Sequence, residues 1–510
     1  MAPTRSTERA GNHQGEMKKY ITEVLRTFYT KKRDADQEVV VYRLRGPELI
    51  GRGYRSNAFR IKTQLGIRPV GQPGAGYHPQ QKSVVVKEYP LVGVIDSTGR
   101  EHDEGRILRE PKALRILGDK TQHLPELMDY VIDRKNRRVR IVMEDLGDVC
   151  FAQEYAPRDS DSLAVLAVLS QQENMRMDRR TLESRLDIDE ARVDRAIERL
   201  KLRGYVHNTQ RSGIINVVDK ANTQYDLSRG HPVETFEYGQ VVIGMFKKGL
   251  TAIFEVQRLA KQHTTKLRAT DVPRPTVEVY TERLMAKLET VVKGYYGTDS
   301  REQRGFEQAY NEVRALVSSE ISTPLADHVS EHNGIIQGDC HPLNMLVRSI
   351  HDKTAGDQRG VKTVALLDLF HMTGGVWLED VVEFLKWAKI TKVITPQTMD
   401  ELLHIEHARR IEEQMPYIGC NRRMEPIEDM KRLARICETQ RNIIDLGSVS
   451  GMLIYHGDKY GEGEQIDILN WKERYGPALN ESLINHPGKT HKVKRLRTLL
   501  SDFIPPIERP

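Results

Sequence analysis

A chain of 510 residues is longer than one ordinary hydrophobic core can fill, and it predicts two or three compact units. Hydrophobic residues make up 38% and charged residues 29% of the chain, a polar composition that still excludes wholesale disorder. The net charge of +6 is small beside 78 basic and 72 acidic residues. This balance excludes a polycation that binds nucleic acid by charge alone, and it indicates surfaces of mixed charge.

The four cysteines are widely spaced and include no Cys-x-x-Cys pair, so they indicate neither a zinc knot nor a disulfide framework. They are Cys150, Cys340, Cys420 and Cys437. No apolar run approaches the roughly 18 residues of a membrane span. The N-terminal segment MAPTRSTERAGNHQGE lacks the apolar core of a secretory signal. We therefore expect a cytoplasmic protein with reduced cysteines and no membrane partner.

Residues 1–38 predict a polar tail and an amphipathic helix, because four apolar residues recur at helical spacing: Ile21, Val24, Leu25 and Phe28. From 39 to 147 the pattern changes to β-type runs such as VVVYRL and VVVKEY, which predict a twisted antiparallel sheet. A loop is expected at Gly66 to Gly76. A helix is expected at Glu104 to Leu117, where Pro111 fits only in the first helical turn.

Residues 161–218 have the order of a winged helix: three helical patterns, then a hairpin whose turn contains Ser212 and Gly213. The third helix has an apolar face and a basic face, the layout of a recognition helix. The apolar face is Val193, Ile197 and Leu200, and the basic face is Arg192, Arg195 and Arg199. The segment from Glu173 to Arg211 holds ten basic and eight acidic residues, and this nearly balanced charge gives little attraction for nucleic-acid phosphates. DNA binding is therefore less favoured than a protein contact or a substrate lid.

The remainder of the chain is mainly helical. Residues 235–395 combine amphipathic helices with two apolar strands, GII at 334–336 and TVALLDLF at 363–370. The tail, residues 396–510, is again mostly helical. The most informative segment lies in the first of these two regions.

In IIQGDCHPLNMLV, Asp339 and Asn344 stand five residues apart in a turn between apolar runs, and Asp368 follows in VALLDLF. Three oxygen-bearing side chains on loop and strand ends can converge on one point. Phosphoryl transfer needs such a set, with one carboxylate to orient and deprotonate the attacking hydroxyl and hard oxygen ligands for Mg²⁺. Asp339 suits the first role, and Asn344 and Asp368 suit the second.

The GDCHPLN segment resembles the aminoglycoside phosphotransferase and choline kinase family, whose signature is approximately HGDxHxxN followed by an apolar strand that bears an Asp. The leading His of that signature is Gln337 here. The resemblance implies an α+β, two-lobed protein-kinase-like fold, with residues 39–147 and 235–395 as its lobes and residues 396–510 as a helical extension. The winged helix inserted at 161–218 departs from the family, which has only a short connector after the hinge. The resemblance also implies ATP and Mg²⁺ as cofactors, Asp339 as the catalytic base, and Asn344 and Asp368 as metal ligands.

Further matches to this family occur in the expected order along the first lobe. IGRGYRSNAFRI resembles the phosphate-covering hairpin, with Gly51, Gly53 and Ser56 near phosphate. Lys87, on a strand after this hairpin, matches the lysine that holds the α- and β-phosphates. Glu110 matches the glutamate that pairs with this lysine. The strand RVRIVMEDLGD resembles the hinge, where the backbone from Glu144 to Leu146 is expected to meet adenine.

Two residues of the second lobe have expected supporting roles. Asp380 is predicted to lie near the catalytic loop as a hydrogen-bond acceptor, although a plain carboxylate at a helix N-terminus accounts for it equally well. His341 is predicted to be a structural histidine, hydrogen-bonded within the loop.

The sequence thus predicts an ATP-dependent phosphotransferase that acts on a hydroxyl of a small-molecule acceptor. One alternative is a protein Ser/Thr kinase, which is disfavoured because no APE-type segment follows Asp368. Another is a nucleotide-sensing regulator that acts through the winged helix without turnover. The Lys, Asp, Asn and Asp set argues against an inactive site.

Overall fold

The computed structural model divides the chain into two compact units, each described by itself. The sheet unit comprises Met1–Asp96, Glu101–Leu146 and Ala269–Asp271, and the helical unit comprises Ser97–Arg100, Gly147–Arg268 and Val272–Pro510. The described residues are 5–507 except 33–36, 53–54, 70–79, 148–149, 153–164, 166–175, 187–192, 195, 198–199, 201–205, 209–213, 218–236, 333, 351–360, 392–393, 395, 415–426, 461 and 489. This mixed content, a sheet unit and a largely helical unit, is consistent with the predicted kinase-like fold.

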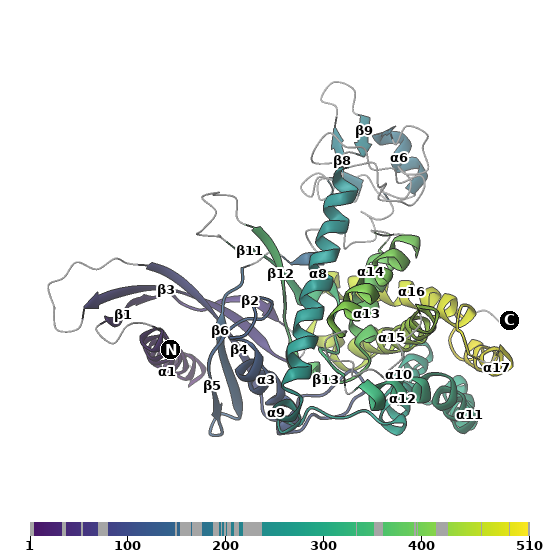
Figure 1. The fold of residues 1–510 in the computed structure, drawn as a ribbon, viewed down its shortest axis with the longest axis horizontal. Helices are drawn as coiled ribbons and strands as arrows, with labels where there is room; N and C mark the ends of the chain where they lie inside the picture. The colour runs from purple at the N-terminus through teal and green to yellow at the C-terminus, as the bar shows by residue number, and fades with distance from the viewer. Residues whose placement is uncertain are drawn as a thin grey trace. The chain divides into compact units, whose positions relative to one another are not determined.

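The sheet unit is built on one antiparallel sheet (Figure 1). Its strands are β1 Gln37–Leu44, β2 Glu48–Arg52, β3 Asn57–Pro69, β4 Gln80–Pro90, β5 Leu127–Asp133 and β6 Arg138–Glu144. The order is β1-β3-β4-β6-β5, and β2 pairs with β3. Val84 and Val86 of β4 are fully buried, as the alternation in VVVKEY requires. The predicted antiparallel sheet is confirmed.

The helix α1, Arg5–Lys31, supplies part of the core of this unit. Met17, Ile21, Val24 and Leu25 are buried in one cluster with residues of β1, β3, β4 and β6. The predicted amphipathic helix is therefore present, and its apolar stripe packs on the sheet.

Two local predictions for the sheet unit are wrong at their edges. β3 continues to Pro69 and pairs with β1 from Thr63 to Pro69, so Gly66 to Pro69 are strand rather than the start of the predicted loop. The remainder of that predicted loop, 70–76, lies outside the described residues. The predicted helix Glu104–Leu117 is two helices, α2 Glu104–Ile107 and α3 Arg109–Leu117. Pro111 has no N–H, and its ring conflicts with the carbonyl four residues earlier, so one continuous helix is not possible. Pro111 does lie in the first turn of α3, as predicted.

Among its described residues, the helical unit contains further helices and three small sheets. Its helices before the candidate site are α8 Glu237–Gln262, α9 Thr264–Arg268, α10 Val277–Tyr296, α11 Arg301–Val317, the π-helix η2 Ser318–Ser322 and α12 Thr323–His332. The strands near the site are β10 Ile335–Ile336, β11 Met345–Ile350, β12 Val361–Leu366 and β13 Thr373–Gly374, and short 3₁₀ turns are η3 Pro342–Asn344 and η4 Leu369–His371. The helices after the site are α13 Trp377–Ile390, α14 Pro396–Gln414, α15 Ile427–His456, α16 Glu462–Ile484 and α17 Thr490–Ser501, with the 3₁₀ turn η5 Gly457–Lys459.

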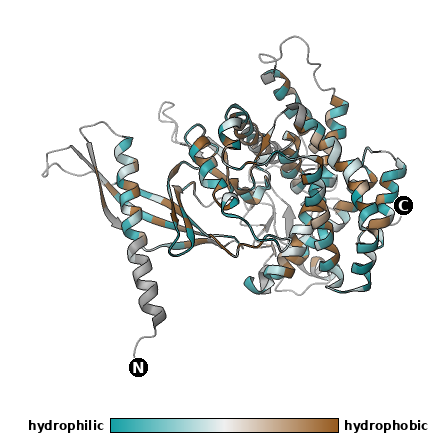
Figure 2. Cartoon of the chain, turned by 90° about the horizontal axis from the view of Figure 1, so that it is seen from below, coloured by the Kyte–Doolittle hydropathy of each residue, from teal (hydrophilic) through white to brown (hydrophobic). Residues whose placement is uncertain are grey.

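Helix α13 is the central helix of this unit, because it is buried from Leu378 to Ala388. Its Phe384 ring lies 5.3 Å from the ring of Phe151 and 5.0 Å from that of Phe246 on α8. Hydrophobic and hydrophilic stretches occur on the same helices, as expected for amphipathic helices around one core (Figure 2). No helix among the described residues is both long enough and apolar enough to cross a membrane.

Within the predicted winged-helix segment, the structure describes β7 Arg176–Asp178, α6 Arg179–Leu186, β8 Val206–Asn208 and β9 Ile214–Val217. β8 and β9 pair antiparallel, which confirms the predicted hairpin, and the strand order is β7-β9-β8. Leu182, Ile197 and Leu200 are buried. The hairpin turn and Arg192, Arg195 and Arg199 lie outside the described residues. The winged helix itself stays a prediction.

We expect Leu25→Ala to lower the free energy of unfolding of the sheet unit by about 2–5 kcal/mol, because it leaves a cavity between α1 and the sheet. The measurement is hydrogen exchange of the β3 and β4 amides in the full chain. Arg26→Ala, at the exposed neighbouring position, is the control and should change stability by less than about 0.5 kcal/mol. Equal protection in the two variants would contradict the packing role of α1.

Candidate functional site

In the sheet unit, Lys87 on β4 and Glu110 in the first turn of α3 form an ion pair. The Lys87 Nζ lies 2.9 Å from Glu110 Oε2 and 3.1 Å from Oε1. Both side chains are largely buried, and the hydroxyl of Tyr89 also donates to Glu110. A carboxylate held by two donors is fixed in position, and it fixes the lysine in turn. The predicted pairing is present, and its role toward phosphate stays a prediction.

The other predicted nucleotide residues of the sheet unit lie around β2, β3 and β6. Gly51 on β2 pairs with Ala58 of β3, and Ser56 directly precedes β3. Gly53 lies outside the described residues. Glu144 ends β6, and its backbone N–H donates to the carbonyl of Glu126 at 2.9 Å. That N–H is therefore already engaged within the sheet.

Asp145, between the predicted adenine residues Glu144 and Leu146, makes a contact that the sequence did not predict. Its carboxylate accepts two hydrogen bonds from the Arg60 guanidinium, at 2.6 and 3.0 Å, and both side chains are almost fully buried. Bidentate pairs of this kind fix geometry as well as charge. The segment from Glu144 to Leu146 is thereby tied to β3.

In the helical unit, the loop after β10 carries Asp339, and a buried carboxylate holds the start of this loop. Asp380, near the beginning of α13, accepts hydrogen bonds from the backbone N–H of Gln337 and of Gly338, each at 2.8 Å. The Gln257 side chain of α8 is its third donor, at 2.8 Å. The prediction that Asp380 supports this loop as an acceptor is confirmed.

Gln337 links this loop to the Asp368 segment. Its amide nitrogen donates to the carbonyls of Leu367 and Asp368, both at 2.9 Å, and its amide oxygen accepts the N–H of Asp339 at 2.7 Å. Gly338, with φ of 85°, lies so close to His371 that a Cβ would stand 2.4 Å from the His371 carbonyl oxygen. Only glycine fits both the conformation and this contact. The two loops are therefore held together.

Asn344 and Asp339 are brought together as the motif predicts. The Asn344 Nδ2 donates to the Asp339 carboxylate and to its carbonyl, each at 3.0 Å. Asn344 ends η3, and its carbonyl accepts the N–H of Leu367 at 2.8 Å. Because the amide nitrogen faces Asp339, the amide oxygen is the atom suited to a cation.

The prediction that Asp368 lies inside a strand is wrong, because Asp368 lies two residues beyond the end of β12. Its φ and ψ are 58° and 65°, a left-handed conformation that interrupts the extended chain before η4. Asp tolerates this conformation better than most residues. A ligand atom of Asp368 lies within 4.8 Å of ligand atoms of Asp339 and of His371.

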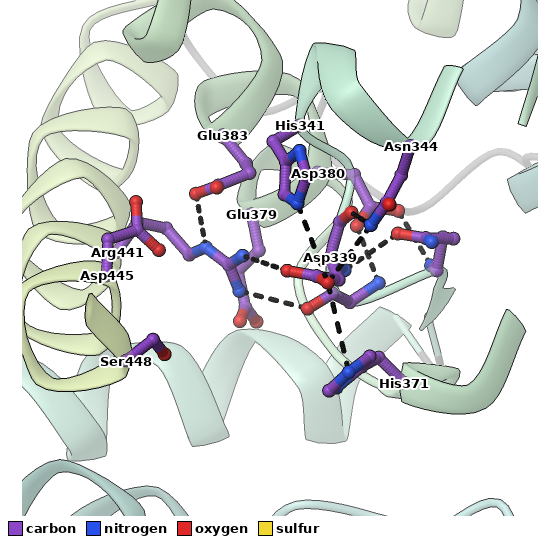
Figure 3. Close-up of polar contacts among 12 residues, drawn as sticks. Asp339, His341, Asn344, His371, Glu379, Asp380, Glu383, Arg441, Asp445 and Ser448 are labelled. Atoms are coloured by element: carbon purple, nitrogen blue, oxygen red, sulfur yellow. Dashed lines mark hydrogen bonds and ion pairs between the residues drawn. The ribbon is translucent and has the colours of Figure 1, made fainter. Parts of the chain in front are cut away.

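Two histidines flank the Asp339 carboxylate (Figure 3). The Nε2 atoms of His341 and His371 each lie 3.8 Å from Asp339 Oδ2. The Nδ1 of His341 accepts the N–H of Leu343 at 3.2 Å, which confirms the predicted hydrogen bond within the loop. His371 was not singled out by the sequence, since it belongs to none of the matched motif positions.

Arg441 of α15 approaches Asp339 from a different side than the two histidines and was also missed (Figure 3). Its Nη1 donates to the carbonyl of Gly338 at 3.1 Å, and its Nη2 lies 3.9 Å from Asp339 Oδ1. Its Nε donates to Glu383 at 2.6 Å. Nothing local in the sequence relates a residue on α15 to a loop about 100 positions earlier.

Arg441 belongs to a buried set of two cations and two anions on α13 and α15. Lys386 pairs with Asp445 and lies 3.3 Å from Glu383. Although burial opposes it, the neighbouring Arg441 and Lys386 charges hold the pKa of Glu383 well below its usual range. Glu383 and Asp445 in turn raise the pKa of Arg441 against the effect of burial. The set is electrically neutral, which makes its burial tolerable.

Comparison with known proteins found no matching family model and no matching curated protein. Two solved structures are similar to this chain at low identity. One is described as a "putative aminoglycoside phosphotransferase" from Ralstonia eutropha JMP134, with 11% identity, a TM-score of 0.38, and coverage of 93% of this chain and 98% of that chain. The other is an ethanolamine kinase from Plasmodium vivax, with 10% identity, a TM-score of 0.32, and coverage of 89% and 85%.

We expect Arg441→Met to lower the free energy of unfolding of the helical unit by about 3–5 kcal/mol, because Glu383 loses its main partner while buried. In Arg441→Met/Glu383→Gln both charges are removed, and Lys386 still neutralises Asp445. The double variant should therefore recover more than about 1 kcal/mol of the loss. Urea denaturation followed by circular dichroism measures both values. A double variant that is no more stable than the single one would contradict the charge-balance argument.

The buried Asp380 gives a second prediction. Burial raises its pKa from 3.8 to about 6, although its N–H donors favour the charged form. The folded state therefore binds more protons than the unfolded state between these values, and this stabilisation is lost as the pH rises toward 6. The free energy of unfolding of the wild type minus that of Asp380→Asn should therefore fall from pH 4 to pH 6, by at most about 1.4 kcal/mol per pH unit.

Urea denaturation of both proteins at pH 4, 5, 6 and 7 measures this difference. Asp458→Asn, an exposed position on η5, is the control and should show no such trend. A wild-type free energy of unfolding that rises with pH relative to that of Asp380→Asn would contradict the raised pKa of Asp380.

Proposed function

We propose that this chain is a phosphotransferase that moves the γ-phosphate of Mg-ATP to a hydroxyl group of a small molecule. The observation that carries the proposal is the geometry around Asp339. Its side chain is 29% exposed, its carboxylate is held by the Asn344 amide, and it lies within 4.8 Å of an Asp368 ligand atom on a second loop. A fixed, accessible carboxylate beside hard oxygen donors is the arrangement that phosphoryl transfer to an alcohol needs.

The residues fit a bound Mg²⁺ by their chemistry. The Asn344 amide nitrogen is occupied with Asp339, which turns its oxygen toward ligands, and Asp368 offers a carboxylate. Both are hard oxygen donors of the kind that Mg²⁺ prefers. When bound there with ATP, the ion neutralises charge on the phosphates.

The protein residues then have separate tasks. Asp339 orients the acceptor hydroxyl and accepts its proton as the oxygen attacks phosphorus. The Asn344 amide donates to this carboxylate and keeps it in place, the backbone N–H of Asp339 donates to the Gln337 amide oxygen, and Arg441 approaches the other carboxylate oxygen. Lys87, oriented by Glu110, binds the α- and β-phosphates. Gly51, Gly53 and Ser56 are proposed to contact phosphate, and the backbone of Glu144 and Leu146 to contact adenine.

We retain a protein hydroxyl as the alternative acceptor. Incubation of the purified chain with γ-labelled ATP and either a metabolite pool or a cell extract separates the two. Label in a small product supports the proposed function, and label in protein supports a Ser/Thr kinase. Tight ATP binding without transfer to either would instead favour a nucleotide-sensing regulator.

The strand order β7-β9-β8, with α6 between β7 and β8 in the chain, supports a winged helix inserted at 161–218. We propose that this module contacts a protein partner or covers the substrate, in line with its nearly balanced charge. We also propose a cytoplasmic location. The same proposal divides the chain into the N-terminal tail and helix, the first lobe, the winged helix, the second lobe and the helical extension, at 1–38, 39–147, 161–218, 235–395 and 396–510.

We expect Asp339→Asn to retain less than about a tenth of the wild-type transfer rate while its ATP affinity is nearly unchanged, because the carboxylate acts on the acceptor. Asp368→Ala should instead weaken Mg²⁺-dependent ATP binding. Single-turnover transfer and isothermal titration with Mg-ATP measure the two effects. Asp458→Asn, an exposed carboxylate on η5, should transfer phosphate at the wild-type rate. A transfer rate of Asp339→Asn above about a tenth of the wild-type rate would refute Asp339 as the base.

Deleting residues 161–218 and joining the ends with a short flexible linker should leave a folded chain that still binds Mg-ATP. A winged helix buries its own small core, and Leu182, Ile197 and Leu200 are buried. Phosphorylation of the acceptor or partner binding should fall instead, and DNA affinity of the full chain should be negligible at physiological salt. A specific duplex bound by the full chain and released by Arg195→Ala and Arg199→Ala would show that the module binds DNA.

A further inference from the structure

Asp339, Asp368 and His371 form a cluster that shares only Asp368 with the proposed Mg²⁺ pair. Asp339 lies in the loop after β10, and Asp368 and His371 lie in the segment after β12. One ligand atom from each of the three lies within 4.8 Å of the other two. The Nε2 of His371 is 3.8 Å from Asp339 Oδ2, and these two side chains face each other in Figure 3.

The loops that carry these three residues are fixed to each other. Gln337 donates to the carbonyls of Leu367 and Asp368 and accepts the N–H of Asp339. Gly338 packs directly against the His371 carbonyl. Among the described residues, the Asn344 amide donates one hydrogen bond to Asp339 Oδ2, and a carboxylate oxygen has a second lone pair to offer. The donors are thus positioned by their neighbours, as ligand sets usually are.

His341 provides an internal contrast, because its Nε2 is also 3.8 Å from Asp339 Oδ2. Its Nδ1 accepts the N–H of Leu343, so in the neutral ring the proton lies on Nε2. A protonated nitrogen does not ligate a metal. His341 also lies outside the cluster formed with Asp368. Of the two histidines, His371 is therefore the one suited to ligation.

We propose that Asp339, Asp368 and His371 form a site for a divalent transition metal of the Mn²⁺ and Zn²⁺ class, with His371 as its nitrogen ligand. Bonds of roughly 2.0–2.2 Å to nitrogen and oxygen bring ligand atoms about 3 Å apart, so small side-chain movements close this cluster on an ion. An imidazole with two carboxylates favours these ions over Mg²⁺, which prefers oxygen donors alone. The site shares Asp368 with the proposed Mg²⁺ pair but replaces Asn344 by His371.

Occupation of this site has a consequence that rests on the proposed function. A metal bound to the Asp339 carboxylate removes the base that accepts the proton of the acceptor hydroxyl. Transition metal bound in this way therefore inhibits phosphate transfer. Metal binding itself is independent of that function and is tested without nucleotide.

The experiment uses the full chain and Mn²⁺ alone, followed by electron paramagnetic resonance. We expect Mn²⁺ to bind and its pulsed spectrum to show ¹⁴N modulation from a coordinated imidazole. His371→Ala should abolish this modulation and raise the Mn²⁺ Kd by at least about tenfold. His341→Ala, at the same distance from the same oxygen, should retain both the modulation and the wild-type affinity.

Absence of ¹⁴N modulation in the wild type, its persistence in His371→Ala, or its loss in His341→Ala would each overturn the proposal. Circular dichroism checks the fold of every variant. His371→Gln, which keeps a side chain of similar reach without an imidazole, replaces His371→Ala should the latter not fold. Because no ATP is present, failure of this test leaves the phosphotransferase proposal intact, and failure of Asp339→Asn to reduce transfer leaves the metal site intact.

Discussion

The candidate site depends on one buried carboxylate, that of Asp380. Its side chain is buried, so its charge needs support from the protein, which the nearby Arg441 charge and three donating N–H groups supply. Two of these belong to consecutive residues, Gln337 and Gly338, which fixes the direction in which the chain leaves β10. Asp339 follows at once. A carboxylate on the central helix α13 therefore sets the position of the proposed base without touching it.

The same loop is supported from behind by a neutral set of buried charges. Arg441 reaches the carbonyl of Gly338 only because Glu383 holds its other edge, and Glu383 is in turn shared with Lys386. Burying four charges costs more than burying apolar residues of the same volume, so packing alone does not account for them. Their position next to the proposed base does. Helix α15, far along the chain, is thereby part of the site.

The sequence could predict contacts within each unit where a local pattern or motif marks them. Asp339 and Asn344 of the helical unit lie within one turn, so pattern was sufficient there. Lys87 and Glu110 of the sheet unit were paired through their positions in the motifs that carry the resemblance. Arg441 and the Arg60 to Asp145 pair join segments that are 85 or more positions apart, and only the fold reveals them. The predicted limits of an element were wrong where a single residue sets them. Pro111, for example, divides the predicted helix into α2 and α3.

Gln337 shows most clearly what the sequence could not supply. The resemblance marks it as a departure from the family's His, which by itself suggests a loss. Its amide has two N–H donors and an acceptor oxygen, whereas a neutral imidazole offers one donor and one acceptor. Here all three are used, on two carbonyls of the Asp368 segment and on the N–H of Asp339. Glutamine therefore joins the two loops through more hydrogen bonds than the one donor and one acceptor of a neutral imidazole provide, and it ties the segment that carries Asp339 to the segment that carries Asp368.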